Sequence, residues 1–284
     1  MKLTTLAGNT PLIRISNRIY AKLETYNPTG SVKDRVVTYL VDKAIREGKI
    51  TGDSILCEAT SGNTGIALSA CAASLGLKCI IYMPENMSEE RRQMMRAYGA
   101  EIIDAPADDF AAAISMRDNH VNSSSNVWSP NQFENQDNIE CHRTQTAPEI
   151  LADVEAANMK SWDAFIHGSG TGGTIEGVRR FIVDKGLTTK VCMTVPSETP
   201  HGIQGIADGK EFLAKASDMN MSINISTQDA IDRAKLFAKT TGLLVGISSG
   251  ANILAAESFV NLFPGKGAVV TMLCDRGERY MTIY

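Results

Sequence analysis

Short apolar runs alternate with helical patterns along most of this 284-residue chain. Between residues 54 and 103, predicted strands at Ser54–Glu58, Lys78–Met83 and Glu101–Ile103 enclose predicted helices at Gly65–Leu75 and Ser88–Tyr98. Strands that alternate with helices at this spacing predict a parallel sheet with crossover helices. This alternation is the strongest constraint on the fold, because it leaves little room for all-helical or all-β architectures.

The same alternation resumes after a polar segment, Asn119–Asn138, which we interpret as an interdomain or site-forming loop. The further elements predicted are extended segments at 12–15 and 19–23, helices at 147–157, 174–183, 227–240 and 251–262, and strands at 164–167, 190–195, 243–247 and 268–273. We therefore expect an α/β fold with two lobes, each with a mainly parallel sheet flanked by helices.

Polar and glycine-rich loops follow several of the predicted strands. They are Thr60–Gly65, Gly168–Gly173, Ser248–Gly250 and Cys274–Gly277. In open α/β sheets, ligands bind beyond the carboxyl ends of the strands. These loops are therefore the candidate binding segments.

One lysine stands at an unusual place in the chain. Turn-forming residues, Asn27-Pro28 and Gly30, precede Ser31 and Asp34, which have the form of a helix N-cap with an acidic partner. Lys33 is thus predicted in the first turn of a helix, where the helix dipole favours the neutral amine. A neutral amine is what an attack on a carbonyl requires. A solvated surface lysine is the alternative interpretation.

The loop Gly168–Thr174 lies between a predicted strand and a predicted helix, so its backbone amides could cradle a phosphate. The glycine spacing also fits a dinucleotide fingerprint, with Glu198 as the acidic ribose partner, which would suit a nicotinamide-dependent oxidoreductase. The extra Gly172 and the flanking threonines favour a compact monophosphate. A tight loop needed only for backbone geometry is the third possibility.

A second anion-binding turn is predicted at Thr60–Gly65, which offers hydroxyls, an amide and backbone N–H groups without a charge of its own. This composition suits a carboxylate. Asp275 follows an apolar strand and could either cap a helix or face a ring nitrogen. An imine-forming lysine, a phosphate loop, a carboxylate loop and a ring-nitrogen partner together indicate a pyridoxal phosphate site.

Composition excludes other classes of function. The net charge of −4 and a pI near 5.7 argue against a nucleic-acid partner. The sequence has no apolar run long enough for a membrane span and no signal-peptide core near Met1. The six cysteines are scattered without a Cys-x-x-Cys pair, so we expect reduced thiols in a cytoplasmic protein and no zinc site or disulfide.

With these segments in view, the chain resembles the cysteine synthase (O-acetylserine sulfhydrylase) family of pyridoxal-phosphate enzymes, which have the tryptophan-synthase-β fold. The resemblance runs from Gly8-Asn9-Thr10-Pro11-Leu12 to Gly277-Glu278-Arg279-Tyr280. The segments that carry it are Asn27–Arg35, Glu58–Ala67, Met83–Ala100, Gly168–Gly177, Gly246–Ala251 and Cys274–Tyr280.

The resemblance implies a role for each candidate residue. Lys33 would carry the cofactor as a Schiff base and then act as the base at the substrate α-carbon. Asn63 would bond the ring hydroxyl, Asp275 would face the pyridine nitrogen, and Ser248 would belong to the cofactor site. The residues implied for the cofactor phosphate are Gly170, Thr171, Gly172, Gly173 and Thr174, and those for the substrate carboxylate are Thr60, Ser61, Gly62, Thr64 and Gln132.

The implied reaction is a β-replacement: O-acetylserine loses acetate to leave an aminoacrylate on the cofactor, and sulfide adds to give L-cysteine. The family also implies a smaller movable lobe, residues 36–140 here, and a larger lobe of residues 1–35 plus 141–284. It further implies a homodimer and, in A-form members, binding of the serine acetyltransferase tail.

The sequence departs from the family pattern in several places. Cys274–Gly277 resembles the B form, and its aspartate would favour a protonated pyridine ring. Pro200–Ile206 resembles the A form, and the arginine-bearing loop associated with thiosulfate use has no clear counterpart. The stretch Val195–Gly209 is shorter than in relatives.

Several alternatives remain open on the sequence. One is a related enzyme of the same fold, such as a cystathionine β-synthase acting on O-acetylserine or serine, or a serine/threonine dehydratase. Another is a non-catalytic partner of serine acetyltransferase. We expect no catalytic role for the four histidines. We also expect Arg91, Arg92 and Arg96 to form a solvated helix face.

Overall fold

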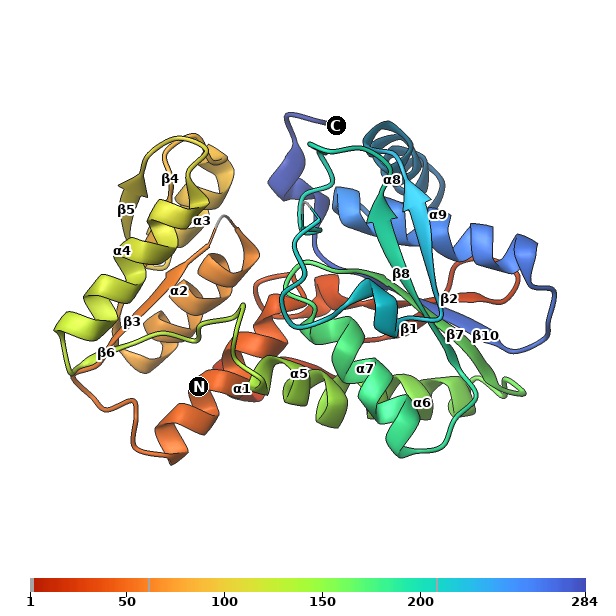
Figure 1. Cartoon of the computed structure of the whole chain (residues 1–284), viewed down its shortest axis with the longest axis horizontal. Coiled ribbons are helices and arrows are strands. Elements are labelled where there is room, and N and C mark those ends of the chain that lie inside the picture. The colour runs from red at the N-terminus through yellow and green to blue at the C-terminus, as the bar shows by residue number, and fades with distance from the viewer. Residues whose placement is uncertain (1–2, 61, 208) are drawn as a thin grey trace. The chain divides into compact units, whose positions relative to one another are not determined.

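The computed structural model describes residues 3–60, 62–207 and 209–284. Contacts between residues divide the chain into two compact units, the first made of Met1–Ala7 and Asn27–Asn135 and the second of Gly8–Tyr26 and Gln136–Tyr284. Each unit is built on its own sheet, with helices packed against it (Figure 1). The predicted α/β fold with two lobes is therefore confirmed.

The second unit contains the larger sheet. Its strands are β1 (Leu12–Arg14), β2 (Ile19–Leu23), β7 (Trp162–Gly168), β8 (Lys190–Pro196), β9 (Met221–Ile225) and β10 (Ala268–Leu273). They lie in the order β1-β2-β10-β7-β8-β9, and only β1 and β2 pair antiparallel. The two short extended segments predicted near the amino end are thus confirmed as strands, with β1 at the edge of this sheet and β2 between β1 and β10.

Helices precede or connect the parallel strands of the second unit. They are α5 (Asp137–Cys141), α6 (Ala147–Ala156), α7 (Gly173–Asp184), α8 (Thr227–Thr241) and α9 (Ile247–Leu262), and a π-helical turn at His142–Thr146 joins α5 to α6. Ala255 and Phe259 of α9 pack with Ile166 of β7 and Val269 of β10 in one buried cluster. Figure 1 shows α5, α6 and α7 on the other side of the sheet from α8 and α9.

The first unit is a smaller sheet between helices. Its strands are β3 (Ile55–Ala59), β4 (Lys78–Pro84), β5 (Glu101–Ala105) and β6 (Val127–Trp128), all parallel in the order β5-β4-β3-β6. Its helices are α1 (Lys33–Arg46), α2 (Asn63–Leu75), α3 (Glu89–Ala97) and α4 (Phe110–Ser123). Each strand of this sheet continues into a loop that leads to the next helix or turn.

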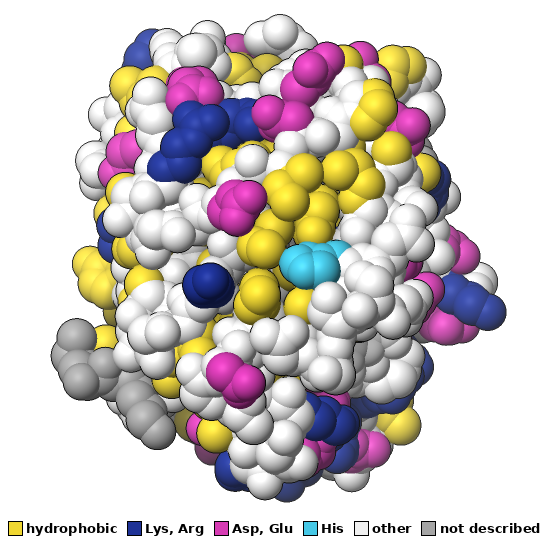
Figure 2. Space-filling view, turned by 90° about the vertical axis from the view of Figure 1, so that its left-hand side faces the viewer, with side chains coloured by type: hydrophobic (Ala, Val, Ile, Leu, Met, Phe, Trp, Pro, Cys, Tyr) yellow, Lys and Arg dark blue, Asp and Glu magenta, His cyan; other side chains and the backbone are white. Residues whose placement is uncertain are grey.

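Successive residues of β3 point to opposite faces of this sheet, as the period of a strand requires. Leu56 packs with Leu68 of α2 and Met95 of α3, whereas Cys57 packs with Ala113 of α4. Helices α1, α2 and α3 therefore cover one face, and α4 covers the other. On the surface that faces the viewer in Figure 2, hydrophobic side chains gather beside charged side chains of both signs.

The structure corrects some of the predicted elements. Residues 243–247 do not form a strand, because Val245 makes only an isolated bridge to Arg276 and α9 already begins at Ile247. Helix α4 extends to Ser123, so it occupies the start of the segment 119–138 that we interpreted as a loop. The prediction also missed β9, an edge strand on which buried and more exposed residues alternate.

The predicted lobes of 36–140 and of 1–35 plus 141–284 concern movement, and they remain a prediction. By contacts, the segment Asn27–Arg35 belongs to the first unit together with α1. Among the described residues, no helix is long and apolar enough to cross a membrane.

All six cysteines are buried and free. Burial raises the pKa of the Cys57, Cys71 and Cys79 thiols to about 12. These thiols are therefore protonated at neutral pH and serve as small core residues, as the sequence predicted.

The core assignment predicts different costs for the same substitution at two helical leucines. Leu68 is fully buried in α2, whereas Leu236 in α8 is 52% exposed. Leu68→Ala should lower the free energy of unfolding by about 2–5 kcal/mol, and Leu236→Ala by less than about 0.5 kcal/mol. Urea unfolding of both variants measures the difference, and equal losses would contradict the core described above.

Candidate active site

Lys33 lies in the first turn of α1, as predicted, but the N-cap is Val32 rather than Ser31, and the neighbouring aspartate holds the helix start. One carboxylate oxygen of Asp34 accepts from the Thr29 hydroxyl at 2.6 Å, and the other accepts from the backbone N–H groups of Thr29 and Ser31 at 3.1 and 3.3 Å. Gly30 adopts a φ of 84° in the preceding turn, which a residue with a side chain rarely does. The partly exposed Lys33 is therefore presented from a rigid turn.

The expected carboxylate loop is the turn between β3 and α2. Helix α2 begins at Asn63, and Gly62 is its N-cap. The amides in the first turn of a helix have no carbonyl acceptor within the helix, so they point at an approaching anion. Of the residues predicted to hold the substrate carboxylate, Ser61 lies outside the described residues. Thr60, Gly62 and Thr64 are all at this helix start.

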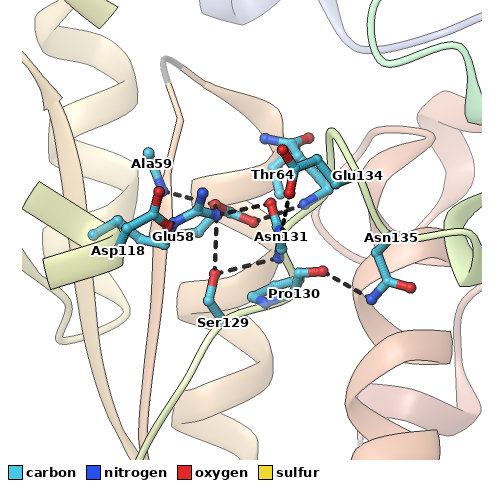
Figure 3. Close-up of polar contacts among 11 residues, drawn as sticks. Glu58, Ala59, Thr64, Asp118, Ser129, Pro130, Asn131, Glu134 and Asn135 are labelled. Carbon is cyan, nitrogen blue, oxygen red and sulfur yellow. Dashed lines mark hydrogen bonds and ion pairs between the residues drawn. The ribbon is translucent and has the colours of Figure 1, made fainter. Parts of the chain in front are cut away.

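Gln132 joins this group from the loop that follows β6. Its side-chain oxygen accepts a hydrogen bond from the Thr64 hydroxyl at 2.6 Å, and only 3% of Gln132 is exposed. Figure 3 shows Thr64 beside this loop. The structure thus brings together two predicted carboxylate-binding residues that lie far apart in the sequence.

An arginine that we predicted on a solvated helix face lies beside the same loop. Arg91 and Arg92 are buried, and only Arg96 of the three is exposed, so that prediction was wrong for two residues. A Cβ at Gly62 would lie 3.2 Å from the Arg91 guanidinium. The carboxylate loop therefore has a positive charge close by. The apolar Met95 lies one helical turn after Arg91, and this spacing is a sequence signal that this face of α3 points inward. In the structure Met95 is buried.

The expected phosphate loop connects β7 to α7 in the second unit. Its glycines approach other backbone segments so closely that a side chain would not fit. A Cβ at Gly170 would lie 2.4 Å from the Gly205 carbonyl oxygen, and one at Gly172 would lie 2.5 Å from the Ala214 nitrogen. Gly172 also has a φ of 90° and is the N-cap of α7. This packing leaves the first-turn amides of α7 for an anion.

Two hydroxyls complete this helix start, and each bonds to a residue that sequence reasoning left without a role. Asn138 donates to the Thr171 hydroxyl at 3.0 Å. A ring nitrogen of His142 lies 3.1 Å from the Thr174 hydroxyl, and its other ring nitrogen lies 2.9 Å from Thr146. These partners come from α5 and the turn after it, so no local sequence pattern could identify them.

Asp275 follows β10 and is 1% exposed. Its carboxylate accepts a hydrogen bond from the Tyr280 hydroxyl at 2.5 Å. A Cβ at Gly246 would lie 2.0 Å from the Asp275 carboxylate, so this aspartate requires the glycine. Ser248 follows Gly246 by two residues. It belongs to the first turn of α9 rather than to a loop as predicted, because the helix starts at Ile247.

The donor sets of the two units differ in the anion that they suit. The α7 start offers amides and hydroxyls, which fit a phosphate monoester, and the amine of Lys33 in the first unit and the acid of Asp275 in the second are the group types that a pyridoxal cofactor requires. In the described part of the chain, no group of three or more His, Cys, Asp or Glu side chains could hold a metal ion. The residues present thus fit pyridoxal phosphate.

This account predicts that the phosphate loop tolerates no added methyl group. In Gly173→Ala, the new Cβ would lie 2.0 Å from the buried Asn138 side chain, and it should weaken binding of pyridoxal phosphate at least tenfold, or about 1.4 kcal/mol. Gly52→Ala is the matched control, because no atom lies within 4 Å of its Cβ position. Titration calorimetry with pyridoxal phosphate compares the variants, and equal dissociation constants would refute the assignment of the loop.

Comparisons with known proteins agree with this assignment of the cofactor. A family model described as "Pyridoxal-phosphate dependent enzyme" matches residues 3–275. The chain is 39% identical over 297 residues to cysteine synthase B of Campylobacter jejuni, and the alignment covers 99% of this chain and 97% of the relative.

Solved structures give the same result. The O-acetylserine dependent cystathionine beta-synthase from Helicobacter pylori matches with a TM-score of 0.91 and 33% identity, covering 99% of this chain and 97% of that one. The cysteine synthase of Entamoeba histolytica matches with a TM-score of 0.89 and 34% identity, covering 100% and 90%. The chain therefore belongs to the family of pyridoxal-phosphate dependent enzymes.

Proposed function

We propose that the protein is a cysteine synthase that converts O-acetylserine and sulfide to L-cysteine and acetate. The observation that carries the proposal is the carboxylate-type helix start at α2, with Gln132 bonded to Thr64 at 2.6 Å, in the same unit as Lys33. The 39% identity to a cysteine synthase over nearly the whole chain supports the same substrate class.

The substrate carboxylate is proposed to bind at the start of α2. There the first turn of the helix presents backbone N–H groups, and the positive end of the helix dipole attracts an anion. The side chains of Thr60 and Gln132 supply further polar atoms, and both residues are buried. A carboxylate held in this way orients the amino acid so that its α-carbon faces the base.

Lys33 is proposed to hold the cofactor and then to remove the proton from the substrate α-carbon. Bound pyridoxal phosphate supplies an electron sink for the charge that develops at that carbon. The position of Lys33 at a helix start favours its neutral amine, the form that can accept the proton. Acetate then leaves the β-carbon, and sulfide adds to the same carbon.

The second unit is proposed to orient the cofactor. The α7 start with Thr171 and Thr174 would bind the phosphate, and Ser248 would lie in the same site. Asp275 would face the ring nitrogen, and the hydrogen bond from Tyr280 fixes the direction of its carboxylate. An aspartate at this position favours a protonated ring, which is the stronger electron sink.

We also propose the remaining features that the family resemblance implies. These are a homodimer, a cleft that accepts the tail of serine acetyltransferase, and a smaller lobe of residues 36–140 that moves when the substrate binds. A movable lobe would exclude water from the reacting atoms.

A second candidate function is an O-acetylserine dependent cystathionine β-synthase. It is favoured by the match to the Helicobacter pylori enzyme, with a TM-score of 0.91 over 99% of this chain. The two functions share the loss of acetate and differ only in the nucleophile that adds afterwards. Product analysis with O-acetylserine plus sulfide, homocysteine or thiosulfate separates them. Faster formation of cystathionine than of cysteine would replace our proposal with the second one.

The role of Lys33 predicts a large and specific loss of activity. Lys33→Ala should lower the rate of cysteine formation by a factor of about 10²–10⁴ or more, because it removes the proposed base. Lys49→Ala, at an exposed lysine that pairs with Glu47, is the control and should retain the wild-type rate. Both rates are measured from acetate release in the presence of sulfide. A Lys33→Ala protein with the wild-type rate would overturn the proposal.

A further inference from the structure

A buried ion pair lies behind the carboxylate loop of the first unit. Glu58 of β3 is 0% exposed and Arg117 of α4 is 4% exposed, and the Glu58 carboxylate lies 2.8 Å from the Arg117 guanidinium. Burial raises the pKa of Glu58, and the Arg117 charge opposes that rise. A buried ion pair seldom stabilises a fold more than apolar residues of the same size would. Stability alone therefore does not explain why charged residues occupy these two positions.

The remaining contacts of Glu58 are with backbone amides. One carboxylate oxygen accepts from Arg117 and from the Ala59 N–H at 2.8 Å, and the other accepts from the Gln132 N–H at 3.1 Å. Ala59 directly precedes the carboxylate loop, whereas Gln132 belongs to the separate loop that contacts it. The carboxylate therefore connects the two segments through charge-assisted hydrogen bonds.

Arg117 contacts the same loop through two further residues. Its guanidinium donates to the Ser129 hydroxyl and to the Asn131 side-chain oxygen, both at 3.3 Å, and pairs with Asp118 at 2.7 Å. In Figure 3, dashed lines join Ser129 and Asn131 of this loop to the guanidinium. Asn131 has a φ of 48°, a conformation that needs support from its surroundings. Its bonds to Arg117 and Glu134 provide that support.

Gln132 is thus held at both of its ends. Its backbone N–H donates to Glu58, and its side-chain oxygen accepts from Thr64. We propose that Glu58 and Arg117 are positioning residues, which hold Gln132 against Thr64 and so set the affinity of the enzyme for the substrate carboxylate. This inference rests on the proposed function only for the identity of the carboxylate ligand.

The alternative is that the pair stabilises the first unit without any effect on the site. The two ideas differ in what they predict for the loop. A positioning role predicts that loss of the pair loosens residues 129–135 and weakens carboxylate binding in particular. A purely structural role predicts lower stability with unchanged loop order and affinity.

The test compares Glu58→Gln and Arg117→Met with the wild-type holoenzyme. Hydrogen exchange of residues 129–135, read by mass spectrometry, should become at least about tenfold faster in both variants. The KM for O-acetylserine should rise at least about tenfold, as expected for the loss of a hydrogen bond to a charged group, while kcat changes less than about threefold. In a Gln132→Ala background, Arg117→Met should add less than about twofold to KM.

Two further variants keep the test decisive. Arg117→Lys retains a positive charge beside Glu58 but loses the several N–H donors of the guanidinium, so its loop exchange should lie between those of the wild type and Arg117→Met. Arg18→Met removes a buried arginine of the second unit, which pairs with Asp163 at 2.8 Å, and should lower the melting temperature without raising KM.

The inference is overturned if loop exchange is unchanged in Glu58→Gln and Arg117→Met, or if Arg18→Met raises KM as much as they do. The exchange measurement needs no turnover. If the wild-type protein made no cysteine, the proposed function would fall, while faster loop exchange in the variants would still support the positioning role.

Discussion

The amide groups at the start of one helix in each unit are the feature on which the proposed binding of anions depends. Helices α2 and α7 each begin directly after a parallel strand, so their first-turn N–H groups point beyond the carboxyl edge of a sheet without an acceptor in the helix. Such ends attract anions, and their surroundings decide which anion fits. Around α7 the glycines pack against neighbouring backbone. Around α2 the polar atoms of Thr64 and Gln132 meet.

Within each unit, side-chain contacts hold the residues that lie near these helix ends. Asp34 holds the turn from which Lys33 projects, and the Glu58–Arg117 pair holds the loop of Gln132. In the second unit, Tyr280 fixes the carboxylate of Asp275. Each of these groups contacts a residue that we propose to bind the cofactor or the substrate. Pre-organised donors of this kind do not need to reorganise when charge develops on the substrate.

Much of the fold could be predicted from the sequence, because its signals are local and periodic. Alternating apolar runs indicated the parallel sheets, and turn residues placed Lys33 at a helix start, where the structure has it. The prediction failed where tertiary contacts decide. The apolar run 243–247 was read as a strand, yet Gly246 packs against Asp275 and caps α9 instead. Arg91 was predicted to be solvated from its charge, although the apolar Met95 one helical turn further on indicated that this face of α3 is buried.

Residues that act through others were also beyond the reach of sequence patterns. Glu58 and Arg117 lie on different elements, and His142 reaches Thr174 from another helix, so no spacing along the chain connects either pair. Their roles emerge only when the contacts are known.

The central claim is that Lys33 binds pyridoxal phosphate covalently. Borohydride reduction of the holoenzyme, followed by peptide mass spectrometry, tests this claim most directly. We predict that the added mass of the reduced cofactor is found on the peptide that contains Lys33. The same mass on another lysine, or on no peptide of a protein that retains the cofactor, would contradict the account.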